Sequence, residues 1–306
     1  MRILGGFFYY MDKYAKPPLS LSQQIDLLKS RGLIVKSQPK AEAFLSQVNY
    51  YRFSAYCLPF ESARHQFKTG ITFEQVRELY EFDRRLRFLI DEALEIIEIA
   101  MRSTVAYHLS HKHGPFVHED ASKFYAGFDH TVWIAKVHEE TERSTETFIT
   151  HYRNKYEGFP EMPIWMVVET MSFGGLSKLI NNFLRVDQIE VAKKFGLHSK
   201  VLTSWLHTFT YVRNICAHHS RLWNRELAIA MIVPRAKFWD EVDAKRVMSV
   251  VLAVNYLISK LSPGNHIKDL WRQEIEEMFD AKINIPNFHE AMGTKSDLKS
   301  HPLWKA

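Results

Sequence analysis

Apolar residues recur at spacings of three and four along most of the chain, which is the period of an amphipathic helix. The clearest run consists of Val76, Leu79, Leu86, Leu89, Ile90, Ala93, Leu94, Ile97, Met101 and Val105. A capping-box pattern at Thr72 and Gln75 precedes this run, so we predict a long helix from Phe73 to about Leu109. No stretch of useful length alternates between apolar and polar residues as a strand does. The expected fold class is therefore all-α.

Start and stop signals divide the rest of the chain into further helices. Ser20 and Gln23 form a second capping-box pattern, and Gly32 stands where that helix is expected to end. A short helix through residues 44–48 leads into a cluster of aromatic residues and then an irregular stretch to Gly70. The Gly174-Gly175 pair predicts a break between helices. The remaining predicted helices cover residues 130–155, 165–171, 176–183, 187–195, 199–212, 243–261 and 266–280, with a loop after 285.

These elements suggest three parts of the chain. We expect an N-terminal helical and aromatic segment at residues 1–70, packed on a core helical domain at residues 71–262. A C-terminal helix and tail follow at residues 263–306. No apolar stretch is long enough to cross a bilayer, so the expectation is a soluble protein with no membrane partner.

Composition and charge narrow the function classes. The two cysteines, Cys57 and Cys216, are far apart, which excludes a disulfide framework or a Cys-rich zinc site and predicts a reducing, cytoplasmic location. The formal net charge of +5 and pI of about 9.0 suit a polyanionic partner such as RNA, although many proteins of other function are equally basic. No phosphate-binding glycine loop, nucleophile elbow or metalloprotease motif is present.

Candidate chemistry concentrates in residues 210–225, where a polar group follows a strongly apolar helix. Its members are Arg213, Asn214, His218, His219, Arg221, Asn224 and Arg225. A solvated helix face favours Lys and Glu, whereas these side chains contact phosphate or move protons. Asn214 and His218 are four residues apart, so they share a helix face and a hydrogen bond between them would orient the imidazole.

This set suits phosphodiester cleavage by an adjacent 2′-hydroxyl. His218 would act as general acid or base, and Arg213 would stabilise the charge on the phosphoryl oxygens. The nucleophile is internal to RNA, so the reaction needs no metal or cofactor, and it leaves a 2′,3′-cyclic phosphate and a 5′-hydroxyl. The spacing alone is weak evidence, because an Arg-x4-His pair is expected by chance in a chain of this composition. The similar pair Arg102 and His108 is interpreted as coincidental.

The match to a known pattern extends beyond that spacing. RNICAHHSRLWNR resembles the signature of the Abi (abortive-infection) family, as do the blocks KPPLSLSQQIDLLKSRGL, NYYRFSAYCLPF, YEFDRRLRFLIDEALEIIEIAMRSTVAYHLS and WMVVETMSFGGLSKL. These blocks span residues 16 to about 225. The resemblance places the chain with HEPN domains, which are compact helical bundles, here with additional N-terminal and C-terminal helices.

The resemblance also implies roles for particular residues. Arg213 and His218 match the catalytic pair of the HEPN ribonucleases, and Asn214 matches the polar residue after the Arg. His219 is common in the Abi form. Such enzymes assemble one site from two motifs, so a homodimer is expected. Glu169 is either a polar contributor from a neighbouring helix or a buried structural partner of Arg213.

Other candidates have two interpretations each. His108, His111, His113 and His118 suggest either a metal site or, as we favour, histidines that stabilise helix-end carbonyls. Asp83, Arg84, Arg85 and Arg87 line an RNA groove or form solvated ion pairs. Tyr50, Tyr51 and Arg52 stack on bases or, as we favour, pack at the core and its rim. Trp165, Trp205 and Trp223 are expected to be packing residues.

The favoured function is an antiviral endoribonuclease, with Arg221 and Arg225 as further RNA-binding residues. Such an enzyme must be restrained, so an antitoxin, another inhibitory protein or a small regulatory RNA is an expected partner. One alternative is a non-catalytic RNA-binding sensor. Another is an interaction protein of a toxin–antitoxin pair, in which the motif serves the dimer interface.

Overall fold

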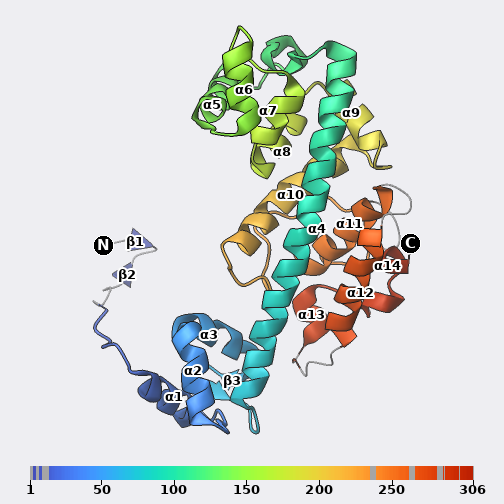
Figure 1. The fold of residues 1–306 in the computed structure, drawn as a ribbon. Helices are drawn as coiled ribbons and strands as arrows, with labels where there is room; N and C mark the ends of the chain where they lie inside the picture. The colour runs from blue at the N-terminus through green and yellow to red at the C-terminus, as the bar shows by residue number, and fades with distance from the viewer. Residues whose placement is uncertain are drawn as a thin grey trace. The chain divides into compact units, whose positions relative to one another are not determined.

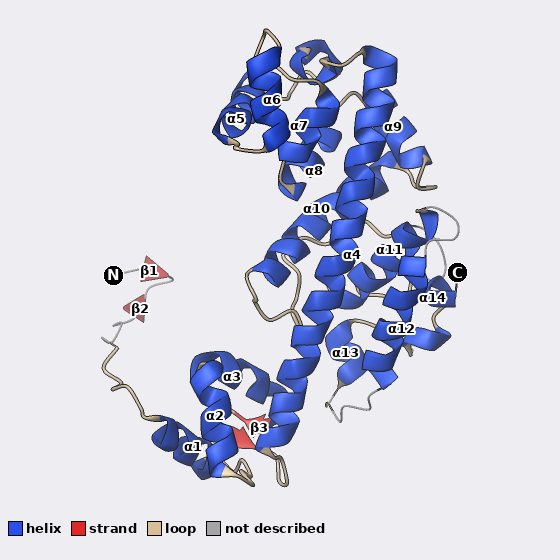
Figure 2. Cartoon of the chain, in the orientation of Figure 1, coloured by secondary structure: helices blue, strands red, loops and turns tan. Residues whose placement is uncertain are grey.

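The computed structural model describes residues 3–4, 7–8, 14–234, 239–261, 266–280, 285, 287–295 and 297–305. Within these ranges the protein is built from helices, with two small antiparallel strand pairs, so the all-α expectation is confirmed (Figure 2). No helix in the described ranges combines the length and apolar character needed to cross a bilayer. The chain divides into two compact units, Met1–Tyr80 with Asn284–Pro286, and Glu81–Ile283 with Asn287–Ala306. The three domain limits expected from the sequence stay predictions.

In the described residues, the first unit contains three complete helices, the first turns of a fourth, and both strand pairs. Its elements are β1 (Ile3–Leu4), β2 (Phe7–Phe8), α1 (Leu21–Ser30), α2 (Gln38–Gln47), α3 (Tyr50–Cys57), the 3-10 turn η1 (Leu58–Phe60), β3 (Glu61–Ala63) and β4 (Gln66–Phe67). The predicted capping box is present, because Ser20 and Gln23 exchange backbone-to-side-chain hydrogen bonds of 2.8 and 3.3 Å. The stretch before Gly70, expected to be irregular, contains the β3–β4 pair.

The aromatic cluster forms the core of this first unit. The rings of Phe53 and Phe73 stack with centroids 4.7 Å apart, and Phe44 meets both edge-on. Tyr51 is 86% exposed, so the packing interpretation was wrong for this residue. Its position on α3 explains this, because the buried residues Phe53, Tyr56 and Cys57 lie on the other side of the helix.

The long predicted helix is α4 (Phe73–His113), drawn in teal in Figure 1, and it runs one turn beyond the expected end. Gly114, with a φ of 92°, follows it. Its apolar stripe is buried as predicted: Leu86, Leu89, Ile90 and Ala93 have no exposed surface. This helix carries several of the charged residues discussed below.

The middle of the second unit is a group of shorter helices. They are η2 (Val117–Glu119), η3 (Ala121–Lys123), α5 (His130–Arg143), α6 (Thr147–Lys155), α7 (Ile164–Thr170), α8 (Phe173–Asn182), α9 (Arg185–Lys193) and α10 (Ser199–Ala217). The single helix predicted at residues 130–155 is interrupted at Ser144, which is extended and caps α5. Helix α10 packs against α8 and α9.

The glycine break was predicted in the wrong place. Helix α8 begins at Phe173, and Gly174 and Gly175 lie in its first turn, because the Ser172 hydroxyl caps the Gly175 N–H at 3.1 Å. A Cβ on Gly174 would lie 3.3 Å from the Thr210 methyl group of α10. The glycine therefore permits a close approach of two helices rather than ending one.

The C-terminal part of the second unit contains α11 (Val247–Lys260), α12 (His266–Asp280), α13 (Phe288–Met292), η5 (Leu298–Ser300) and α14 (Pro302–Lys305). The prediction of a loop after residue 285 was therefore wrong for α13, η5 and α14. Asn255 is buried in α11 and donates a hydrogen bond of 2.9 Å to the Leu303 carbonyl. Trp271 donates one of 2.8 Å to the Leu89 carbonyl, so α12 is tied to α4 within this unit.

Candidate functional site

The candidate site lies at the C-terminal end of α10. The inner face of this helix is apolar, and Trp205, Phe209 and Val212 are fully buried. The helix extends five residues beyond the predicted end at Val212, so Arg213 and Asn214 lie in its last turns. Arg213, Asn214, His218 and His219 are all exposed. The residues expected to act on a substrate are thus gathered at one accessible helix end.

A hydrogen-bonded turn fixes the backbone of the two histidines. His218 is the C-cap residue, and its N–H donates to the Asn214 carbonyl at 3.0 Å. The Ser220 N–H donates to the Ile215 carbonyl and the His219 N–H to the Cys216 carbonyl, each at 2.9 Å. This is the Schellman pattern, which places the residue after the cap in the left-handed region. That residue is His219, with a φ of 55°, where glycine is usual.

The segment after this turn is held by a buried carboxylate. Asp83 of α4 has no exposed surface, and its Oδ1 accepts hydrogen bonds from the N–H groups of Leu222 at 3.1 Å and Trp223 at 2.5 Å. Arg87, 5% exposed, forms an ion pair with the same carboxylate. The Asp83–Arg87 pair therefore anchors the motif segment to α4, and it is neither an RNA-groove lining nor a solvated ion pair.

The other arginines of that α4 run form exposed ion pairs. Arg84 Nε lies 2.8 Å from a Glu81 carboxylate oxygen. Arg85 Nη2 lies 3.9 Å from Glu274 and 4.0 Å from Glu277. The solvated-pair interpretation is confirmed for these two arginines.

Two groups near the C-terminal end of α10, the Asp91 carboxyl and the Cys216 thiol, have raised pKa values. Burial raises the pKa of the Asp91 carboxyl on α4, and the positive charges of Arg213 and His219 oppose that shift. Burial raises the pKa of the Cys216 thiol to about 12, with the Asp91 charge adding to the effect. A thiol that stays protonated is a poor nucleophile. Cys216 is therefore a packing residue, although it stands inside the motif.

Glu169 does not pair with Arg213. Its side chain is 54% exposed, and a carboxylate oxygen lies 3.4 Å from Arg102 Nη1. Arg102 also donates to the carbonyls of Glu169 at 2.9 Å and Met171 at 2.7 Å, and pairs with Glu98. The alternative of a buried Glu169–Arg213 pair was wrong, because Glu169 pairs with Arg102, which also binds the carbonyls at the junction of α7 and α8. A catalytic contribution of Glu169 stays a prediction.

The arginines after the turn are half-buried. Arg225 Nε donates to the Arg221 carbonyl at 2.6 Å, which closes a local loop. Asn224, with a φ of 49°, accepts a hydrogen bond of 3.0 Å from Arg246. The proposed contacts of Arg221 and Arg225 with RNA stay predictions.

The four histidines considered for a metal site have other partners. His111 Nδ1 lies 2.7 Å from the Tyr107 carbonyl, so the helix-end interpretation is confirmed for this residue. It was wrong for His108 and His113, which lie 3.6 and 3.0 Å from the buried Asp187 carboxylate. His118 lies 3.2 Å from Glu119. In the described part of the chain, no group of three or more His, Cys, Asp or Glu residues is arranged to hold a metal ion.

Trp205 and Trp223 are fully buried, as expected for packing residues, whereas Trp165 is 49% exposed on α7 and that prediction was wrong. Asp83 and Asp91 were not predicted to be neighbours of the motif. The signal for Asp83 was available: it falls on the apolar stripe of α4, four residues after Leu79 and three before Leu86. A carboxylate at a core position requires a partner, and Arg87 stands one turn later.

Comparison with known protein families identifies a match over the middle of the chain. A family model described as "Abi-like protein" matches residues 43–224, which is more than half of the chain and includes the whole of α10 and the turn after it. No curated protein and no solved structure matches.

Proposed function

Because the chain belongs to the Abi-like protein family, and the family match points to abortive infection, we propose that it is an antiviral, metal-independent endoribonuclease of the HEPN type. The observation that carries the proposal is the exposed Arg213, Asn214 and His218 at an anchored helix end. The helix and its Schellman turn hold the backbone of all three, so a substrate meets positioned groups. Preorganised groups contribute to catalysis because little reorganisation is needed during the reaction.

In the proposed reaction the RNA supplies its own nucleophile. One His218 takes the proton of the 2′-hydroxyl, whose oxygen attacks the adjacent phosphorus. The bond from phosphorus to the 5′-oxygen breaks, and a second imidazole donates the proton that this oxygen needs. Arg213 stabilises the negative charge on the non-bridging oxygens. The products are a 2′,3′-cyclic phosphate and a 5′-hydroxyl.

In the proposal the second imidazole is His218 of another copy of the chain, so the proposal includes a homodimer. On an ideal helix Arg213 and His218 are about 140° apart around the axis. An Arg from one copy and a His from the other would meet a single phosphate more readily than two side chains on different faces of one helix. The restraining partner, whether an antitoxin or a regulatory RNA, and the cytoplasmic location are part of the same proposal.

The test compares the wild-type protein with His218→Ala and Arg213→Ala on a mixed RNA pool in EDTA. We expect the wild type alone to cleave, with cyclic-phosphate ends identified by chemical mapping. The control is His151→Ala, which removes another exposed histidine of the same unit, on α6. RNA binding without cleavage by the wild type would favour the sensor. Dissociation of the dimer by either motif variant, measured by light scattering, would favour the interaction protein.

A further inference from the structure

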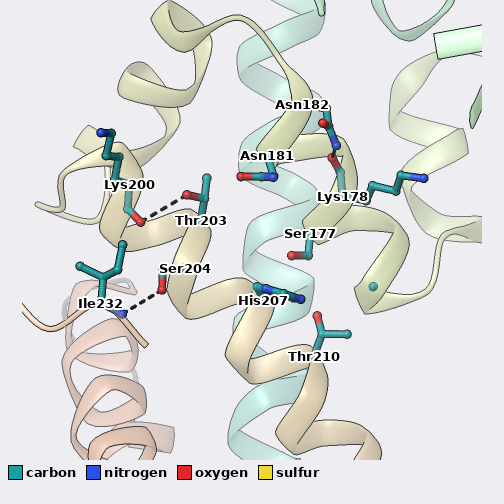
Figure 3. Close-up of a pocket in the computed structure, with 11 residues that line it drawn as sticks. Ser177, Lys178, Asn181, Asn182, Lys200, Thr203, Ser204, His207, Thr210 and Ile232 are labelled. Carbon is teal, nitrogen blue, oxygen red and sulfur yellow. Dashed lines mark hydrogen bonds between the residues drawn. The ribbon is translucent and has the colours of Figure 1, made fainter. Parts of the chain in front are cut away.

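A pocket lined mainly by polar residues lies between α8 and α10, next to the candidate site. Its volume is about 630 Å³, which is the size of a small-ligand site. Ser177, Lys178 and Asn181 of α8 line one side, and Lys200, His207 and Thr210 of α10 line the other (Figure 3). None of the described residues that line it is acidic. The pocket thus favours an anionic or polar occupant.

The pocket continues into the motif along one helix face. Thr203, His207, Thr210, Asn214 and His218 follow one another at spacings of four, three, four and four residues, so they form a single stripe on α10. The first three line the pocket, and the last two belong to the motif. Thr210 and His218 are separated by about 12 Å along the axis. A polymer that reaches His218 can therefore also enter the pocket.

The hydrogen-bonding capacity of the lining fits a nucleotide better than a simple anion. The Thr210 hydroxyl donates to the Leu206 carbonyl at 2.9 Å, so its oxygen can only accept from a ligand. Ser204 accepts from the Ile232 N–H at 2.8 Å, so its hydroxyl can still donate. Lys200 and the exposed His207 add donors. Phosphate needs donors alone, whereas ribose hydroxyls and base edges also need acceptors.

We propose that this pocket binds a single-stranded RNA segment that flanks the phosphate cleaved at His218. The inference deepens the ribonuclease proposal and depends on it for the identity of the polymer. Lys200 contacts a backbone phosphate, and His207 contacts a ribose or base. Single-stranded RNA is the form that fits, because its bases and sugars are exposed to side chains, whereas a duplex presents mainly its backbone and shallow groove.

The test measures binding in a His218→Ala background, so that cleavage does not consume the RNA. The probe is a short fluorescein-labelled single-stranded RNA of mixed sequence, followed by fluorescence anisotropy. We expect Lys200→Glu to weaken binding about tenfold, and its dependence on salt to fall by about 0.7 in log–log slope for each phosphate that the variant no longer neutralises. His207→Leu weakens binding at all salt concentrations. The matched control is Lys136→Glu, the same charge reversal on the exposed surface of α5, which leaves binding unchanged.

The proposal is overturned if the Lys200 and His207 variants, folded by circular dichroism, bind RNA as the His218→Ala parent does. It is also overturned if the parent binds no RNA, or if either pocket variant loses RNA binding only because its dimer dissociates. If the wild type cleaves RNA and the pocket variants bind RNA normally, the ribonuclease proposal holds and the pocket proposal fails. If the wild type cleaves no RNA but the pocket substitutions still weaken RNA binding, the ribonuclease proposal fails and the pocket remains an RNA-binding site.

Discussion

At the scale of single residues, the motif depends on a carboxylate that takes no part in the proposed chemistry. Asp83 accepts backbone hydrogen bonds from Leu222 and Trp223 and pairs with Arg87, all in a water-excluded environment. A buried ion pair adds little stability relative to apolar residues of the same volume. Removing only one partner is destabilising, because the other charge then stays buried without that partner. Asp83 and Arg87 are therefore best understood as positioning residues for the segment that follows α10.

We predict that Asp83→Ala lowers the free energy of unfolding by about 3 kcal/mol, because it removes the buried carboxylate that pairs with the Arg87 charge and accepts from two backbone N–H groups. Urea denaturation measures this change. The control, Glu81→Gln, removes an exposed ion pair with Arg84 and changes stability by less than about 0.5 kcal/mol. Equal effects of the two substitutions would contradict the anchoring role of Asp83.

At the scale of elements, titratable side chains join the η2 turn to helix α5. The η2 turn is tied to α5 because His138 Nε2 lies 2.9 Å from a Glu119 carboxylate oxygen. Within η2, His118 Nε2 lies 3.2 Å from the same oxygen. Burial alone would raise the pKa of Glu119, but the hydrogen bonds from His118 and His138 outweigh it and the pKa is lowered. A lowered carboxyl pKa stabilises the folded state above the usual value of 4.5.

We predict that Glu119→Gln is less stable than the wild type by about 1 kcal/mol at neutral pH. The difference shrinks as the pH falls below 4.5 and through the folded-state pKa of Glu119, because the wild-type carboxyl is then protonated and, like the glutamine amide, uncharged. Unfolding free energies measured at several pH values test this. Glu157→Gln, a substitution of an exposed residue, is the control. A difference that widens on acidification would refute the assignment.

At the scale of the whole molecule, the proposed site needs a second copy of the chain. Each copy supplies one Arg213 and one His218, and the proposed reaction uses two imidazoles on opposite sides of a phosphate. The chain also carries a net charge of +5, which suits a polyanionic substrate. Assembly and charge are thus the properties on which the proposed function of the complete protein depends.

We predict that a mixture of Arg213→Ala and His218→Ala subunits, co-purified as mixed dimers, regains part of the RNA cleavage that each variant lacks alone. A mixed dimer contains one intact Arg and one intact His, and these meet only if the site spans the two copies. Because the second imidazole is missing, water must protonate the leaving 5′-oxygen, so only part of the cleavage returns. Cleavage of labelled RNA in EDTA is the measurement. Activity in the mixture no higher than in either single variant would refute a shared site.

The fold class and much of the helix pattern followed from the sequence. The stripe on α4 predicted a long buried helix because apolar side chains at helical spacing must leave water together. Local signals failed where they have two uses. Gly174 looked like a helix break, but the cap at Ser172 and the approach of Thr210 make it a contact point inside α8. Ser144 splits the helix predicted at 130–155 without any glycine or proline.

The sequence by itself determined the all-α class and the family, and it indicated the candidate residues Arg213, Asn214 and His218, because periodicity and motif spacing are local properties of the chain. Only the tertiary structure decided which distant groups meet them. Asp83 accepts a hydrogen bond from Leu222, which is 139 residues away in the sequence. Arg102, and not Arg213, pairs with the Glu169 carboxylate. Helices α8 and α10 together line a pocket next to the motif. Such pairings depend on how helices pack, and no local pattern encodes which helix faces come together.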